Sequence, residues 1–261
     1  MYAHTTITRR GHRAGFLGFG LLAIGIPAFA GLVGTAHAAT VEKQTVPLDS
    51  ATAITAELDM DFGVLKVGPA AAGGSDLFRG DFSFDDDEWL PEVTYRIEGE
   101  TGDLNVQQPG DFGDLDVNDL DDIGRNDGNR WDVQLSPDVP LDLTVDLDSG
   151  SSELNLGGLD IRALDVETNA GEITIDLTGG DWVHDLDAAI DSKAGTVKLV
   201  VPGDVGVRID ADTTVGDVDA DGFERDGEAY VTAAYGDSPV TLRIDIDVTV
   251  GEIDLEVAPP A

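Results

Sequence analysis

One pattern recurs through the second half of the chain: apolar and polar residues alternate, a glycine interrupts them, and the alternation resumes. Alternation with a period of two predicts a β-strand with one buried and one solvated face. Successive glycines are 21, 24, 21 and 35 residues apart, at Gly150, Gly171, Gly195, Gly216 and Gly251, and a fainter copy surrounds Gly63. A unit of this size cannot bury its apolar face alone, so the repeat requires neighbouring units to stack.

The repeat predicts an all-β fold, a parallel β-solenoid (β-helix) with rungs of about 21–24 residues. A rung of this length fits about three short strands with their corners. The recurrent glycine is expected where the chain turns a corner, with a positive φ. Strands joined by short turns also pair as hairpins, so an antiparallel β-sandwich is the alternative. The nearly constant period favours the solenoid.

We expect three segments: a signal peptide at residues 1–38, an N-terminal β region at 39–135, and the solenoid repeats at 136–261. In the second segment the period is blurred, which indicates a broader opening layer. Residues 110–130 are rich in Asp, Gly and Asn and are expected to form an acidic loop on its side. Pro259 and Pro260 are expected to blunt one end of the solenoid, because proline cannot donate to a strand ladder.

The first 38 residues have the order of a secretory signal. Arg9, Arg10 and Arg13 precede an uncharged apolar stretch at residues 14–35, and Ala-His-Ala at 36–38 is typical of a cleavage site. The stretch is long enough to act as an uncleaved membrane anchor instead. In both cases the remainder of the chain is expected outside the cytoplasm, secreted, periplasmic or at the cell surface.

The charge of the chain excludes several classes of function. The whole sequence has a formal net charge of −37, and residues 39–261 hold 12 basic and 52 acidic side chains, or −40. Such a chain repels nucleic acid and anionic lipid surfaces, so neither is expected as a partner. The sequence contains no cysteine, which excludes disulfides, thiolate metal sites and cysteine nucleophiles.

No residue is assigned a catalytic, cofactor-binding or metal-binding role, and we expect no enzymatic activity. His184 is the one histidine after the signal, and no Gly-x-Ser-x-Gly motif is present, so a serine triad is not supported. Acidic pairs are expected by chance in a chain with 52 acids, and none is marked as a glycosidase pair. The tryptophans, at 89, 131 and 182, are spread along the sequence, which favours packing over a carbohydrate platform.

One motif matches the calcium-loop pattern. Carboxylates occupy positions one, three, five and twelve and glycine position six, at Asp217, Asp219, Asp221, Glu228 and Gly222. The motif lies within the long step of 35 residues, where a loop is expected. Its flanks have strand and not helix patterns, and alternating aspartates are common in this chain. Calcium binding and a solvated acidic loop therefore both stay open.

The chain resembles the toast-rack family of extracytoplasmic β domains. The resemblance covers most of the chain after the signal and is carried by residues 57–67, 77–80, 91–95, 130–135, 140–143 and 157–159 and by the Gly-Glu-Ile repeat at Gly171. The family includes adhesin-like modules and the C-terminal domain of cell-wall-active-antibiotics-response proteins. It offers no catalytic residues, and its members look like envelope-stress regulators or surface interaction modules. The regulators are similar in having several membrane spans before this domain, whereas this chain shows only an export signal.

Taken together, these features predict an exported, non-enzymatic module that interacts with, or forms part of, the cell envelope, with a link to envelope-stress response. The expected partner is an envelope protein or glycan. The alternative is a carbohydrate-active or carbohydrate-binding β-solenoid that uses its acidic residues. The sequence leaves the oligomeric state open.

Overall fold

The computed structural model describes residues 40–84, 89–109 and 128–259. The described strands all belong to one compact unit, residues 37–261. The predicted signal at 1–38 and most of the predicted acidic loop, residues 110–127, lie outside the described residues. In the described part of the chain, no helix has the length and apolar character needed to cross a bilayer.

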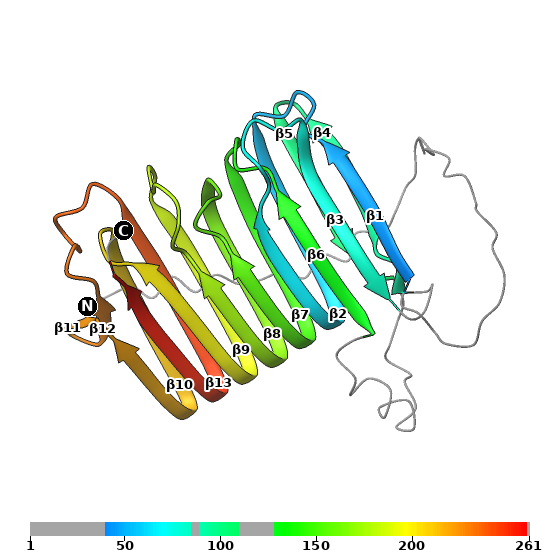
Figure 1. Cartoon of the computed structure of the whole chain (residues 1–261). Helices are drawn as coiled ribbons and strands as arrows, with labels where there is room; N and C mark the ends of the chain where they lie inside the picture. The colour runs from blue at the N-terminus through cyan, green and yellow to red at the C-terminus, as the bar shows by residue number, and fades with distance from the viewer. Residues whose placement is uncertain (1–39, 85–88, 110–127, 260–261) are drawn as a thin grey trace, which may run out of the picture. The chain divides into compact units, whose positions relative to one another are not determined.

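Six long parallel strands form the body of the sheet, and each carries one repeat glycine. In spatial order they are β2 (Ala53–Pro69), β7 (Leu141–Asn155), β8 (Ile161–Asp176), β9 (Leu186–Pro202), β13 (Thr241–Ala258) and β10 (Gly206–Asp221). The predicted parallel solenoid is confirmed, and the antiparallel sandwich is wrong. The composition of a rung differs from the prediction. Each rung is one long strand that bends once, giving two arms instead of three short strands (Figure 1).

The repeat glycines lie side by side at the bend. The pairing puts Gly63 beside Gly150, Gly150 beside Gly171, and so on across the sheet. Their φ angles run from 134° to 152°, so the predicted positive φ is confirmed. A Cβ at Gly171 would lie 1.9 Å from the carbonyl oxygen of Gly150. Glycine is therefore required both by the backbone angle and by the neighbouring rung.

The bend also changes which alternate residues face the core. In β7, Val145 and Leu147 are buried before the bend and Leu154 is buried after it, so the inward position moves from odd to even numbers. The other long strands repeat this shift at their own glycines. Because both arms direct aliphatic side chains inward, one continuous hydrophobic core runs between them.

The chain order departs from a simple coil at the C-terminal end. After β10, the hairpin of β11 (Glu224–Asp226) and β12 (Ala229–Val231) turns the chain back, and β13 then enters between β9 and β10. This excursion accounts for the step of 35 residues. The expectation for Pro259 was wrong, because it follows β13, which is an inner strand and not an end; Pro260 lies outside the described residues.

The other end of the sheet is built from shorter strands. β5 (Thr101–Gln107) pairs with the first arm of β2, and β6 (Asn129–Leu135) pairs with the second. Antiparallel strands then extend both arms: β4 (Glu92–Glu98) beside β5, and β3 (Asp76–Phe84) followed by β1 (Thr40–Pro47) beside β6. These shorter strands lie beside β2 and continue the sheet beyond the six long strands.

Candidate functional site

The in-register stacking places an acidic side chain at one equivalent position of all six long strands, four residues before the bend glycine. We call this set the acidic row. From β2 to β10 its members are Asp59, Asp146, Glu167, Asp191, Asp247 and Asp212. Neighbouring strands lie about 4.8 Å apart, so the carboxylates follow one another at that interval across the outer face of the first arm.

The local sequence explains why the row faces outward. In every long strand an apolar side chain precedes the acid and a second inward-facing side chain follows it, as Val145 and Leu147 flank Asp146 in β7. Burial of these neighbours directs the acid to the solvated face. Because the repeat keeps its inward-facing side chains in register, the outward-facing residues between them are also aligned from strand to strand.

Burial and the neighbouring carboxylates both shift the pKa of the first member of the row. Burial, followed by the charges of Asp146, Asp61, Glu57 and Asp148, raises the pKa of Asp59 to about 6. Gln107 of β5 donates a hydrogen bond to a carboxylate oxygen of Asp59 at 3.3 Å.

The same effect recurs near the other end. Burial and then the charge of Asp210 raise the pKa of Asp245, while Arg208 opposes this shift. Asp245 stands two residues before a row member, Asp247, on β13. Acidic side chains beside the row thus add to the negative potential of this face.

The densest part of the face is at β8 and β9. Asp165, Glu167 and Asp191 each offer a carboxylate oxygen, and these oxygens lie within 4.8 Å of one another. In the described part of the chain, this is the one group of three or more acidic or histidine side chains that meets this distance. Oxygen donors of this kind suit hard cations such as Ca²⁺.

The calcium-loop motif takes a different conformation from the one its pattern requires. Asp217, Asp219 and Asp221 are alternate residues of β10 and are extended along the strand, paired with β13. Gly222 has a φ of 82°, and Glu228 follows only after β11. The motif residues are therefore part of a strand and a hairpin, not of one loop wrapped around an ion.

The other residues considered from the sequence lie apart. Trp131 is fully buried and packs edge-on against Phe82, and Trp89 packs edge-on against Phe62 with ring centroids 4.9 Å apart. Trp182 donates its indole N–H to the carbonyl of Leu177 at 3.0 Å. The three tryptophans therefore do not form a shared platform.

Trp182 and His184 do line one pocket, between the turn after β7 and the turn after β8. Its volume is about 250 Å³, and Asp160, Asp181 and Gly158 also line it. His184 is exposed. The pocket combines an aromatic ring with carboxylates, although it lies outside the acidic row.

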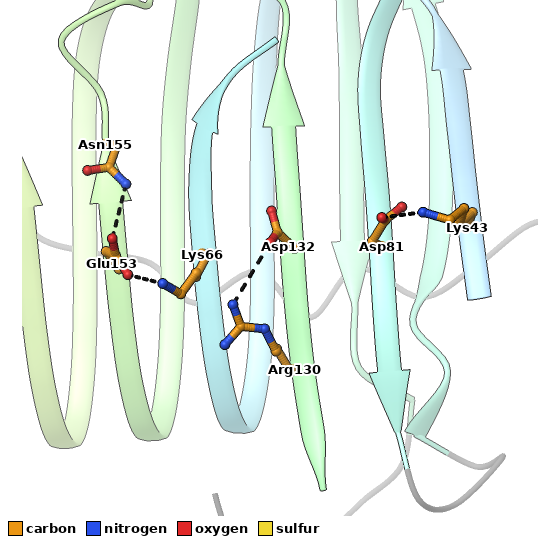
Figure 2. Close-up of polar contacts among 7 residues, drawn as sticks. All are labelled: Lys43, Lys66, Asp81, Arg130, Asp132, Glu153 and Asn155. Atoms are coloured by element: carbon orange, nitrogen blue, oxygen red, sulfur yellow. Dashed lines mark hydrogen bonds and ion pairs between the residues drawn. The ribbon is translucent and has the colours of Figure 1, made fainter. Parts of the chain in front are cut away.

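Basic side chains balance acids on the second arm near the opening layer. Figure 2 shows Lys66 of β2 reaching Glu153 of β7, to which Asn155 also donates a hydrogen bond of 3.5 Å. These contacts lower the pKa of Glu153, with the hydrogen bond from Lys66 as the largest cause. The same view shows Lys43 beside Asp81 and Arg130 3.9 Å from Asp132. The first arm, where the row lies, has the greater surplus of acids.

The acidic row was not predicted from the sequence. Its signal was present, because alignment of the repeats on their glycines places an acid at the same position of each copy. The alternation of apolar residues, which predicts the strands, does not by itself mark the acids between them as a set.

The fold and surface define a stacked, bent-strand β domain with an acidic outer face. The family model for the N-terminal domain of toast_rack matches residues 35–200, and the chain belongs to the toast-rack family. A second model, the C-terminal domain of the cell wall-active antibiotics response protein LiaF, matches residues 150–255. The comparison with curated proteins finds no match.

A solved structure with a high TM-score has the same fold. A predicted cell adhesion protein from Clostridium sporogenes is 25% identical, with a TM-score of 0.77 over 85% of this chain and 100% of that one. A predicted adhesin from Bacteroides fragilis is 13% identical over 82% of this chain and 96% of that one, with a TM-score of 0.29.

Proposed function

We propose that this protein is an exported, non-enzymatic domain of the cell envelope that binds a cationic envelope protein or glycan through its acidic row. The observation that carries the proposal is the in-register alignment of six carboxylates across the sheet. The likeness to adhesion proteins and to the LiaF domain supports a place in the envelope and a role in contact or stress response.

The physical basis is repetition. A single exposed ion pair contributes about 0–1 kcal/mol, but a rigid row presents its charges at a fixed interval of about 4.8 Å. A partner with several basic groups loses its freedom of motion once, on the first contact, and then forms the remaining contacts without paying that entropy again. Binding of this kind is expected to weaken steeply with salt.

The test is capture of envelope components on immobilised residues 40–261. The row variant Asp146→Asn/Glu167→Gln/Asp191→Asn removes three neighbouring charges. The control Glu92→Gln/Glu98→Gln/Glu100→Gln removes three exposed charges from β4 and its turn. We expect wild type and control to retain a component that the row variant loses. Equal capture by all three proteins would show that the row is not the binding surface.

The pocket beside Trp182 favours a second candidate, carbohydrate binding, because an aromatic ring with nearby carboxylates suits a sugar's apolar face and hydroxyls. A glycan screen with wild type and Trp182→Ala separates the two functions. Binding lost in this variant and kept in the row variant would favour the sugar site. Release of reducing sugar would overturn the non-enzymatic proposal.

Export is tested on the protein recovered from its source organism. We expect an intact mass that corresponds to a chain starting at Ala39, after the predicted cleavage site. A mass that includes residues 1–38 would favour the anchor instead.

A further inference from the structure

β10 is the last of the six long strands in the sheet, and only a short part of it is paired on its outer side. β12 pairs with Arg208 and Ile209 of β10. Over residues 210–221, β10 is paired with β13 on its inner side, and none of the described strands pairs with its outer side. A row of unpaired N–H and C=O groups is a template for one more strand.

The core-facing side chains of the second arm of β10 are incompletely covered as well. Val218 and Ala220 are half-buried. Their partners on β13, Ile253 and Leu255, are 0% and 2% exposed because strands flank them on both sides. A strand added beside β10 would cover Val218 and Ala220 in the same way as β10 covers Ile253 and Leu255 of β13.

The opposite end of the second arm also has an unpaired edge, at β1, which pairs with β3 alone among the described strands. The half-buried positions of β1 are Glu42, Gln44 and Val46, and two of these three residues are polar. Of the two edges of the second arm, β10 is therefore the one whose half-buried positions are apolar.

The charge on this edge restricts what can add to it. Asp217, Asp219 and Asp221 occupy the solvated positions of the arm, and Glu252, Asp254 and Glu256 stand beside them on β13. A second copy of this chain pairing edge to edge would set aspartates against aspartates, and like charges directly opposite are destabilising. A strand with basic residues at alternate positions meets the aspartates with opposite charge.

We propose that residues 217–221 of β10 accept an extended segment of a cationic partner protein, which adds a strand to the sheet. Its basic residues lie beside Asp217, Asp219 and Asp221, and its intervening aliphatic residues cover Val218 and Ala220. This rests on the proposed function for the location of the partner, but it concerns a surface on the other arm from the acidic row.

The probe is a labelled, end-capped peptide with the alternating sequence Lys-Val-Lys-Val-Lys, added to residues 40–261. Two peptides serve as controls: Lys-Lys-Lys-Val-Val, with the same composition, and Glu-Val-Glu-Val-Glu, with the opposite charge. Anisotropy measures binding, and amide hydrogen exchange locates it. We expect the alternating peptide to bind most tightly and to slow exchange of the outward amides in residues 217–221.

The variant Asp217→Asn/Asp219→Asn/Asp221→Asn is expected to weaken binding of the alternating peptide by about tenfold or more, from three lost cross-strand pairs. The control Glu92→Gln/Glu98→Gln/Glu100→Gln should bind as wild type does. Equal binding of the two cationic peptides, or no protection within residues 217–221, would overturn strand addition. If residues 217–221 are already protected from exchange without peptide because the protein self-associates, the proposal of a cationic partner would be refuted.

The outcome is separable from that of the proposed function. Loss of envelope capture in the row variant with no peptide protection at β10 would leave the proposed function standing and refute the edge. If the peptide protects β10 and the row variant still captures the envelope component, strand addition at β10 would stand and the proposed function of the acidic row would be refuted.

Discussion

The bend glycines allow the stacking of the rungs to be tested by a single methyl group. In Gly171→Ala, the added Cβ would lie 1.9 Å from the carbonyl oxygen of Gly150. An ordinary carbon–oxygen contact is about 3.3 Å or longer, so the rungs must separate locally by more than about 1 Å. Gly171 also has a φ of 148°, which an alanine adopts only with strain.

The expected magnitude follows from these two costs. A positive φ costs a residue with a Cβ about 1–2 kcal/mol. Local separation weakens about two backbone hydrogen bonds, at about 1 kcal/mol each. We therefore expect Gly171→Ala to lower the free energy of unfolding by about 3–4 kcal/mol, a large share of the roughly 5–15 kcal/mol typical of a domain.

Two matched substitutions separate these costs. Gly179 has a φ of 86°, and a Cβ at this position would meet nothing within 4 Å beyond its adjacent residues, so Gly179→Ala should cost only the backbone strain, about 1–2 kcal/mol. Gly68 lies within β2, and the nearest atoms to its Cβ would be 3.9 Å away, so Gly68→Ala should be neutral or stabilise by up to about 1 kcal/mol.

The assay is urea unfolding of residues 40–261, followed by far-ultraviolet circular dichroism, with the free energy taken from the midpoint and slope. If Gly171→Ala proves no less stable than Gly179→Ala, then close contact between rungs at the bend is not what requires glycine, and the steric reasoning fails.

Three further predictions concern charge. Because the pKa of Asp59 is raised to about 6 from 3.8, the native state holds a proton that the unfolded state releases, so stability should fall as pH rises from about 4 to about 6; after solvent screening the loss is about 1 kcal/mol. Asp59→Asn should abolish this loss in urea unfolding, whereas the exposed control Asp142→Asn should retain it. The variant Asp146→Asn/Glu167→Gln/Asp191→Asn should melt at a higher temperature than wild type at low salt, with a smaller gain from added salt, because repulsion along the row is relieved; a lower melting temperature would contradict this. Finally, Lys66→Ala should cost no more than about 1 kcal/mol at neutral pH, since both side chains of the pair with Glu153 are more than a third exposed. Lys66 lowers the pKa of Glu153, so this cost should vanish as acid protonates Glu153, which a double-mutant cycle with Glu153→Gln measures.

The sequence was sufficient to predict the strand faces, the parallel stacking and the glycine bend. Alternation specifies which side of a strand is buried, and the recurrence of a glycine at Gly150, Gly171 and Gly195 specifies the register. The number of arms in a rung was not predictable in the same way. A period of 21–24 residues fits either one bend between long arms or two corners between short ones, and the difference depends on how both arms pack into one core.

The candidate site was predictable only in part. Alternation placed Asp217, Asp219 and Asp221 on one face, but their spacing suits a calcium loop as well as a strand. These residues form a strand because they pair with β13, which lies about 35 residues further along the chain, so the local sequence alone does not determine the outcome. The pocket beside Trp182 likewise depends on two turns from successive rungs lying together, which no local pattern in the sequence records.

The spatial order of the last two rungs, β10 and β13, is also reflected in the size of their core side chains. β10 precedes β13 in the chain but lies outside it in the sheet. At the four core positions nearest the bend, β13 has Ile246, Val248, Ile253 and Leu255, while β10 has the smaller residues Ala211, Thr213, Val218 and Ala220. An inner rung is covered on both sides and gains from large aliphatics, whereas an edge rung would expose them to water. Side-chain size at aligned core positions therefore distinguishes the edge rung from the inner one, even though chain order suggests the reverse.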